Sequence, residues 1–209
     1  GDRVEFEQRM GYHVDYYPVS SLMDYFKKVT DAEADALVEE YKKLYTIKID
    51  ESGEKVYWEK VHNAAKAEIA LRRVLKDENA TAFTTNFDDL GDADIDAPDF
   101  CGFDQIPGLA SQRLMQEGYG FGAEGDWKTA CLQRTLWVMN QGMPKGCSFL
   151  EDYTLNFAAD CTSSLQSHML EICPLIATGK PKLEVHFLGI GIRKQQTARL
   201  VFTSKTGRG

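Results

Sequence analysis

Three side chains in this sequence are of types that bind divalent metal ions and transfer protons. Glu124 lies in the glycine-rich run Gly118-Tyr-Gly-Phe-Gly-Ala-Glu-Gly-Asp-Trp127, Glu151 interrupts the apolar stretch Phe-Leu-Glu-Asp-Tyr-Thr, and His168 lies in Ser-His-Met-Leu. Carboxylates with imidazole suit manganese, magnesium or cobalt better than a thiolate set would. The chemistry that these residue types favour is therefore a shared metal site.

These residues allow two interpretations, one functional and one purely structural. Glu151 and His168 lie on strand-like segments, where a buried charge needs a metal, a partner or a catalytic role. The alternative is that the two glutamates are surface carboxylates and that His168 is a core histidine with satisfied hydrogen bonds. The other three histidines, His13, His62 and His186, have no comparable context.

The glycine-rich run predicts a tight turn that leads into a helix. Its four glycines let the backbone turn sharply and approach a ligand closely. Asp126 is typical of a helix N-cap, and residues 128–141 carry apolar side chains at helical spacing, namely Leu132, Leu136 and Met139. Glu124 should therefore lie near the positive end of a helix dipole, where a carboxylate tends to stay ionised.

The sequence does not support several familiar functional motifs. Gly120, Gly122 and Gly125 satisfy the dinucleotide pattern G-x-G-x-x-G, but Glu124 would repel a pyrophosphate there. The acidic segment 88–99 matches the start of a calcium-binding loop and lacks the glycine and the final glutamate that such a loop needs. The sequence has no G-x-S-x-G or H-E-x-x-H motif, so common hydrolase chemistry is not indicated.

Composition restricts the class of protein further. The chain has 209 residues, 43% of them apolar, and a formal net charge of −8. Scattered basic residues and this charge argue against nucleic acid or an anionic membrane as a partner. No run of 18 apolar residues occurs, and no secretory leader opens the sequence. Five cysteines without a C-x-x-C pair predict reduced thiols in a cytoplasmic protein.

Hydrophobic periodicity predicts the elements that must position these side chains. Helices are expected at 2–10, from Ser21 to Val29, from the Thr30/Glu33 capping box to Tyr45, at 55–76, and from Pro107 to Gly118. Strands are expected at 12–19, 82–87, 148–157, 165–173, 183–188 and 198–203. The change in texture near Gly146 predicts two parts: an open, layered α/β/α central domain at 1–146, and the beginning of a β-rich, barrel-like domain at 147–209.

Several runs of the sequence resemble L-arabinose isomerases. They are Pro107-Gly-Leu-Ala-Ser-Gln-Arg-Leu-Met115, the glycine-rich run through Ala130, Ala82-Phe-Thr-Thr-Asn-Phe-Asp-Asp-Leu90, Ser148-Phe-Leu-Glu-Asp-Tyr-Thr154, and Ser167-His-Met-Leu-Glu-Ile-Cys-Pro174. Lys182-Leu-Glu-Val-His186 and Leu188-Gly-Ile-Gly191 follow in order. The resemblance spans essentially the whole chain.

The resemblance implies an aldose–ketose isomerase that interconverts L-arabinose and L-ribulose. In that family a divalent ion, typically Mn²⁺, is bound by two glutamates and two histidines. Glu124, Glu151 and His168 fall on three of these ligands, and Phe87 falls on an aromatic side chain that lines the sugar site. The two glutamates would also form the acid–base pair. The second histidine is expected beyond the end of this chain.

The resemblance also implies a longer protein. In the family an N-terminal domain precedes the equivalent of Gly1 and contributes to the site of a neighbouring subunit in trimer-based hexamers. We therefore expect a homo-oligomer, and an isolated chain without activity. Three departures from the family, the acidic segment 88–99, Leu155 and the run Gly191-Ile-Arg193, bear on sugar preference. The alternatives are an isomerase of another aldose such as D-galactose, and a non-catalytic sugar- or metal-binding fragment.

Overall fold

The computed structural model describes residues 2–51, 53–86, 102–104, 106–141, 146–187, 189 and 196–204. Its helices are α1 (Arg3–Met10), α2 (Val19–Lys27), α3 (Asp31–Leu44), α4 (Glu54–Asp77), α5 (Gly108–Gln116) and α6 (Trp127–Met139), with 3-10 turns η1 (Ala123–Gly125) and η2 (Pro174–Ile176). Its strands are β1 (Thr46–Lys48), β2 (Ala82–Thr84), β3 (Gly120–Gly122), β4 (Glu151–Ala158), β5 (Cys161–Ser167), β6 (Lys182–Phe187) and β7 (Gln196–Val201).

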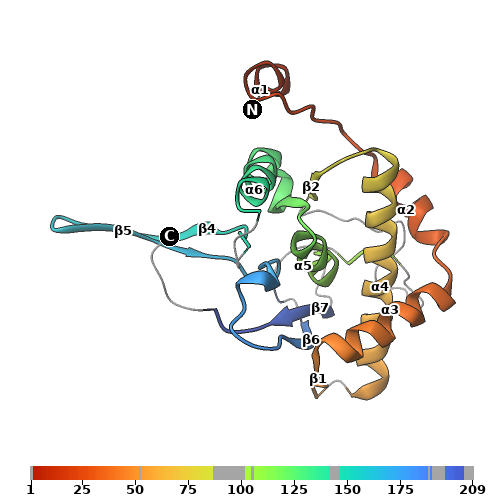
Figure 1. Cartoon of the computed structure of the whole chain (residues 1–209). Coiled ribbons are helices and arrows are strands. Elements are labelled where there is room, and N and C mark those ends of the chain that lie inside the picture. The colour runs from red at the N-terminus through yellow and green to blue at the C-terminus, as the bar shows by residue number, and fades with distance from the viewer. Residues whose placement is uncertain are drawn as a thin grey trace.

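The mixture of helices and strands confirms the predicted α/β fold. Helices α2, α3 and α4 pack together on one side, α5 lies between them and the strands, and α6 covers β2 and β3 (Figure 1). Among the described residues the strands form a three-stranded sheet in the order β1-β6-β7 and two pairs, parallel β2-β3 and antiparallel β4-β5. No helix in these ranges is long and apolar enough to cross a membrane.

Helix α5 is buried along almost its whole length, from Gly108 to Met115. Its apolar side chains belong to three core clusters, so it joins the helical side to the sheets. Two of its buried polar side chains, Gln112 and Arg113, are paired, as burial requires. Arg113 contacts the buried carboxylate of Glu68 at 3.2 Å, and Gln112 donates from Nε2 to the carbonyl oxygens of Ile172 and Leu200.

Strand β1 belongs to the first half of the chain but pairs with a strand of the second half. Thr46 and Lys48 pair in parallel register with Lys182 and Glu184 of β6, and β7 completes this sheet on the other side of β6. Residues before and after Gly146 therefore share one sheet. The predicted domain boundary near Gly146 stays a prediction.

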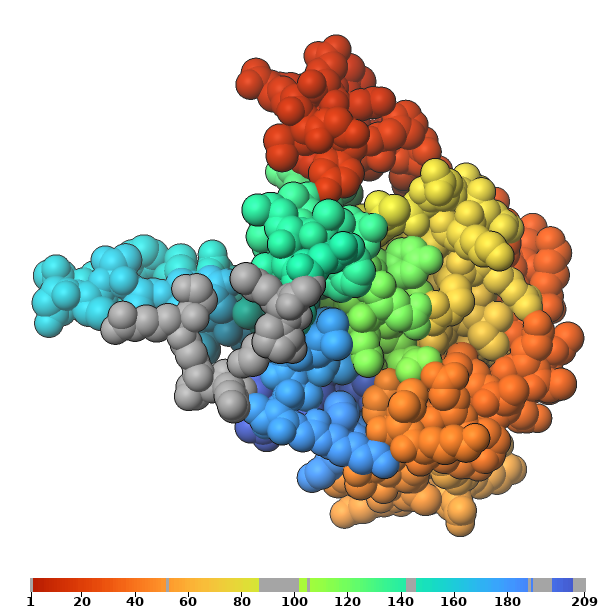
Figure 2. All heavy atoms as spheres, in the orientation of Figure 1, coloured from red at the N-terminus to blue at the C-terminus, as the bar shows by residue number. Residues whose placement is uncertain are grey.

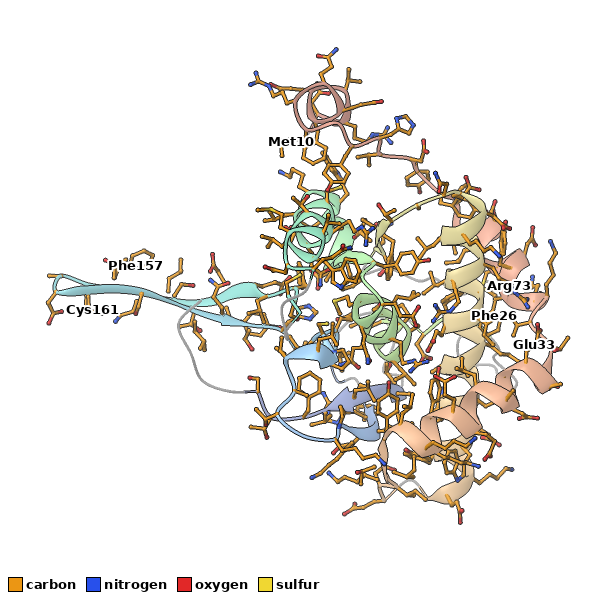
Figure 3. The ribbon with its side chains drawn as sticks, in the orientation of Figure 1. Met10, Phe26, Glu33, Arg73, Phe157 and Cys161 are labelled. Carbon is orange, nitrogen blue, oxygen red and sulfur yellow. The ribbon has the colours of Figure 1, made fainter. Side chains whose placement is uncertain are left out.

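The β4-β5 hairpin projects from the rest of the molecule as an arm (Figures 1 and 2). Phe157 and Cys161 lie near its tip (Figure 3), and Phe157 is 77% exposed. At its base the hairpin reaches the pocket described below. Helix α1 lies apart from the core and contacts α6 through Phe6, whose ring packs edge-on against Trp127 at 4.8 Å.

Most predicted helices are confirmed, with one correction at the start of α2. Helices α1, α3, α4 and α5 lie where they were expected, and Thr30 and Glu33 form the reciprocal capping box. The cap predicted at Ser21 is wrong, because α2 begins two residues earlier, at Val19, after Pro18. The N-terminal strand predicted at 12–19 is also wrong: residues 11–18 have no regular secondary structure and connect α1 to α2, which begins at Val19.

Two predictions in the second half need correction. The strand expected at 165–173 is displaced, since β5 ends at Ser167 and the residues after it turn into the core. Helix α6 follows its Asp126 cap as predicted, yet Leu132 and Met139 of its expected core face are 56% and 74% exposed. The buried residues of α6 are Ala130, Cys131 and Gln133 instead, and Gln133 Oε1 accepts from the N–H of Phe121 on β3.

Candidate active site

A hollow lies where β2, η1 and the segment after β5 meet. We call it the Glu124 pocket. Its lining combines two carboxylates, one imidazole, one phenol, one amide, one aliphatic hydroxyl and four apolar side chains: Thr85, Asn86, Ile106, Ala123, Glu124, Tyr153, His168, Met169, Leu170 and Glu171. The lining comes from segments of both halves of the chain. A pocket with a few converging polar groups is the usual form of a small-molecule site.

Glu124 is placed by the parallel strands β2 and β3. Both strands end at the pocket, so Thr85 and Glu124 leave the sheet side by side. The N–H of Gly125 donates to the Thr85 carbonyl oxygen at 3.0 Å and to Thr84 Oγ1 at 2.9 Å. These bonds fix η1, and within it Glu124 has the left-handed backbone angles φ 59° and ψ 33°. Backbone strain of this kind tends to gather at functional sites.

The glycines of this region allow helix α6 to lie directly against β3. A Cβ on Gly120 would lie 2.1 Å from the Ala130 carbonyl oxygen, and one on Gly122 would lie 2.1 Å from that of Asp126. Asp126 caps α6 as predicted, because its side chain accepts from the N–H of Thr129 at 3.1 Å. The glycine pattern that resembled a nucleotide fingerprint thus serves helix–strand packing.

The β4-β5 hairpin brings Glu151 and His168 together. Glu151 pairs with Ser167 across the hairpin, so His168 follows directly at the base. Glu151 Oε2 lies 4.0 Å from His168 Nε2. The pairing shifts between Asp152 and Thr154, and this irregularity occurs beside Tyr153, which lines the pocket. β-Bulges are common next to active sites because they redirect a side chain.

Burial keeps His168 neutral. Its side chain is 7% exposed, and its ring packs edge-on against Phe149 with 4.8 Å between centroids. Because desolvation penalises the imidazolium form, the pKa of His168 is lowered to about 4. A neutral imidazole is the form that can bind a metal ion.

The pKa of the Glu151 carboxyl group is shifted in the opposite direction, upward. Its pKa is raised, first by burial and then by the negative charges of Glu124 and Asp126. A carboxyl with a raised pKa can hold a proton closer to neutral pH, as a general acid must. The two predicted glutamates therefore influence each other electrostatically, although Glu151 itself is not part of the pocket lining.

Glu171 is a functional candidate that sequence reasoning missed. Its side chain is 4% exposed, and its Oε2 lies 3.3 Å from His168 Nδ1. Burial, with a further contribution from Glu124, raises the pKa of Glu171 to about 8. The only signal in the sequence was its position three residues after His168 in Ser-His-Met-Leu-Glu.

The donor types around the pocket fit a divalent ion. Within the described ranges, no three His, Cys, Asp or Glu side chains are close enough together to hold one. The available donors are nevertheless carboxylates and a neutral imidazole, and the buried Nδ1 of His168 has no aligned hydrogen-bond partner. Phe87 and the acidic segment 88–99 lie outside the described residues.

Comparison with known proteins assigns the family. A model of the L-arabinose isomerase central domain matches residues 1–142, and one of the L-arabinose isomerase C-terminal domain matches residues 146–209. The chain belongs to the L-arabinose isomerase family. The resemblance of its sequence blocks to these enzymes is thereby confirmed.

Individual members of the L-arabinose isomerase family are similar over the whole chain. The L-arabinose isomerase of Bacteroides thetaiotaomicron is 67% identical over 211 residues, and that of Phocaeicola vulgatus is 65% identical over 211 residues. The L-arabinose isomerase of Thermotoga neapolitana is 47% identical and matches 99% of this chain. The chain spans about 40% of the length of these relatives.

Proposed function

We propose that the complete protein containing this chain is an isomerase that interconverts L-arabinose and L-ribulose. The observation that carries the proposal is the meeting of Glu124 and His168 at one pocket, with Glu151 4.0 Å from His168, in a member of the L-arabinose isomerase family. The names of the relatives supply the substrate. The isolated chain, at about 40% of their length, should be inactive alone.

We assign the acid–base work to Glu124 and Glu151. Conversion of an aldose to a ketose moves one hydrogen between C1 and C2 and one proton between O1 and O2. Two carboxylates in different environments can divide this work, because one can stay a base while the other holds a proton. The raised pKa of Glu151 suits it to hold the proton, and Glu124, exposed at the pocket, is accessible to a sugar.

We further propose Glu124, Glu151 and His168 as ligands of a divalent ion, Mn²⁺ or in its place Co²⁺ or Mg²⁺. A bound ion would polarise the sugar carbonyl and stabilise the negative charge that develops on oxygen. The support is the donor set and the neutral state of His168. Phe87 is proposed to line the sugar site.

The remaining proposals concern the whole protein. We infer a cytoplasmic homo-oligomer, a trimer-based hexamer, that acts on a small sugar and on neither nucleic acid nor membranes. The four described cysteines are free thiols, which agrees with a reducing compartment. Sedimentation of the complete protein tests the oligomer, and cell fractionation tests the location.

The decisive experiment is a ketose assay on the protein with its natural ends. L-Arabinose is supplied with added Mn²⁺, or with a chelator as the control, and L-ribulose is measured. Metal-dependent L-ribulose is the expected result. Turnover of D-galactose but not of L-arabinose would change the proposed substrate to another aldose. The absence of turnover with any aldose would contradict the proposed isomerase activity.

A further inference from the structure

Glu171 and His168 form a close pair in the interior beside the Glu124 pocket. His168 Nδ1 and Glu171 Oε2 are 3.3 Å apart, and the two side chains are 7% and 4% exposed. Within the part of the chain that the structure describes, His168 is the only ion-pair partner of Glu171. A carboxyl that is buried this deeply needs a partner or a role.

The backbone around Glu171 is tied to the core on its C-terminal side. The carbonyl oxygen of Ile172 accepts from Gln112 Nε2 at 2.9 Å, and the N–H of Cys173 donates to Ser148 Oγ at 3.0 Å. On the other side, the ring of His168 rests edge-on against Phe149. Both members of the pair are thus held from independent directions.

We propose that Glu171 is a positioning residue that holds the His168 ring by its Nδ1 and leaves Nε2 facing Glu151. This inference rests on the proposed function, because it explains how His168 would be kept ready as a ligand. When Nδ1 carries the proton and donates to an oxygen of the Glu171 carboxyl group, the lone pair is on Nε2. In the other tautomer the proton is on Nε2, and that atom cannot bind a metal ion. Carboxylate–histidine pairs orient metal ligands in this way.

The two groups are close in this structure but are not hydrogen bonded. Nδ1 lies 3.3 Å from the carboxyl oxygen but has no aligned hydrogen bond. Hydrogen bonds of catalytic groups are often long or poorly aligned before ligands bind.

The first test is the tautomer of His168 in the complete, metal-free protein, read from the ¹⁵N chemical shifts of histidine-labelled enzyme. The resonance of His168 is assigned by its loss in His168→Ala. The Nδ1–H form is expected in the wild type and in Glu171→Gln, whose amide oxygen still accepts. Glu171→Ala should shift the population toward Nε2–H. A wild type in the Nε2–H form would overturn the proposal without any further variant.

The second test is Mn²⁺ affinity by calorimetry. Glu171→Ala should weaken binding about 10- to 100-fold, and Glu171→Gln should restore most of it. In a His168→Ala background, Glu171→Ala should have almost no further effect, since Glu171 acts through His168. Glu184→Gln, a partly buried glutamate on β6, is the control that should bind as the wild type does. An equal loss in both backgrounds would refute a positioning role.

These readouts separate the inference from the proposed function. If the complete protein forms no ketose while the tautomer and the Mn²⁺ cycle behave as expected, the isomerase proposal fails and the positioning role stands. If L-ribulose forms but the tautomer is Nε2–H, the isomerase proposal stands and the positioning role of Glu171 fails.

Discussion

Gly122 lies directly against the carbonyl oxygen of Asp126, so close that a Cβ at Gly122 would be 2.1 Å from it. The contact fixes the start of α6 against the end of β3. Glu124 lies between these two residues, in the η1 turn. The position of the proposed catalytic carboxylate therefore depends on a glycine that does not itself line the Glu124 pocket.

Replacement of Gly122 by alanine should displace α6 and with it Glu124. The backbone φ of Gly122 is −136°, which alanine adopts without strain, so the effect is purely steric. We expect a loss of about 1–3 kcal/mol in the free energy of unfolding, as for other overpacked sites, and a clear loss of turnover. Gly179→Ala, where no atom lies within 4 Å, is the control. Urea unfolding and the ketose assay measure both, and equal stability of the two variants would contradict the argument.

Replacement of Glu124 by glycine should stabilise the protein and abolish its turnover. A left-handed backbone costs a residue with a side chain about 1–2 kcal/mol, and glycine avoids this cost. After the lost entropy of glycine, the gain in the free energy of unfolding should be at most about 1 kcal/mol. Asn79→Gly is the matched control, because Asn79 also has a positive φ of 52° and should leave turnover unchanged. A large destabilisation by Glu124→Gly would show that the turn is not strained.

Replacement of Glu151 by glutamine should remove catalysis and leave the fold intact. Glutamine keeps the shape of the side chain but cannot exchange a proton, so turnover should fall by at least about 100-fold. Asp152→Asn is the control, because Asp152 is its exposed neighbour on β4 and contacts Ser164 instead of His168. Initial rates of ketose formation measure the loss of turnover, and circular dichroism checks that the variants are folded. Similar rates for Glu151→Gln and the wild type would remove Glu151 from the mechanism.

Local signals in the sequence predicted the helices well. The capping box of Thr30 and Glu33 and the apolar stripe of α4 are both complete within one segment, and both lie where they were expected. Strand β1 was missed because Thr46–Lys48 is only three residues long, and its partner strand β6 begins at Lys182. A strand this short is recognisable only from the sheet that it joins.

The site shows the same division between local and distant information. Glu124 and His168 were predicted from their motifs, and both line the pocket. Glu171 was not, because nothing in its neighbours indicates that its side chain points inward to His168. The exposed stripe of α6 was misread for a related reason: which face of a helix is buried depends on the partner, here the glycines of β3.

Stability at acidic pH should depend on the cap of α3. The N–H and hydroxyl of Thr30 both donate to Glu33 Oε2 at 2.9 Å, and Arg73 pairs with the other carboxyl oxygen (Figure 3). Together these contacts lower the pKa of Glu33 below 4.5, the Thr30 N–H contributing most. A lowered folded-state pKa means that the stabilisation is present above about pH 4.5 and is lost as the pH falls through the lower value.

Glu33→Gln should accordingly lower the thermal midpoint at pH 7, with the difference from the wild type shrinking as the pH falls below about 4.5. Thr30→Val provides the comparison, because it removes the hydroxyl but keeps the N–H that contributes most. Most of the pH dependence should survive in that variant. Thermal unfolding followed by circular dichroism at pH 7, 5, 4 and 3 gives the curves, and a pH-independent difference for Glu33→Gln would contradict the assignment.

Gln112 links the buried helix α5 to the segment after β5 and to strand β7. Its Nε2 donates to the carbonyl oxygens of Ile172 and Leu200, and its Oε1 accepts from the N–H of Leu200 at 2.7 Å. Gln112→Ala leaves these buried main-chain groups without partners, at about 1–3 kcal/mol each, so we expect a loss of at least roughly 3 kcal/mol in the free energy of unfolding. Gln116→Ala, in the same helix but exposed, should change it little.

The same change should also reach the site, because Ile172 is next to Glu171. Freed from Gln112, the segment after β5 would hold His168 less firmly, and Mn²⁺ affinity should fall along with stability. Urea titration and calorimetry on Gln112→Ala and Gln116→Ala separate the two effects. If Gln112→Ala lost stability but bound Mn²⁺ as the wild type does, the anchoring of His168 would have to come from Phe149 and the hairpin alone.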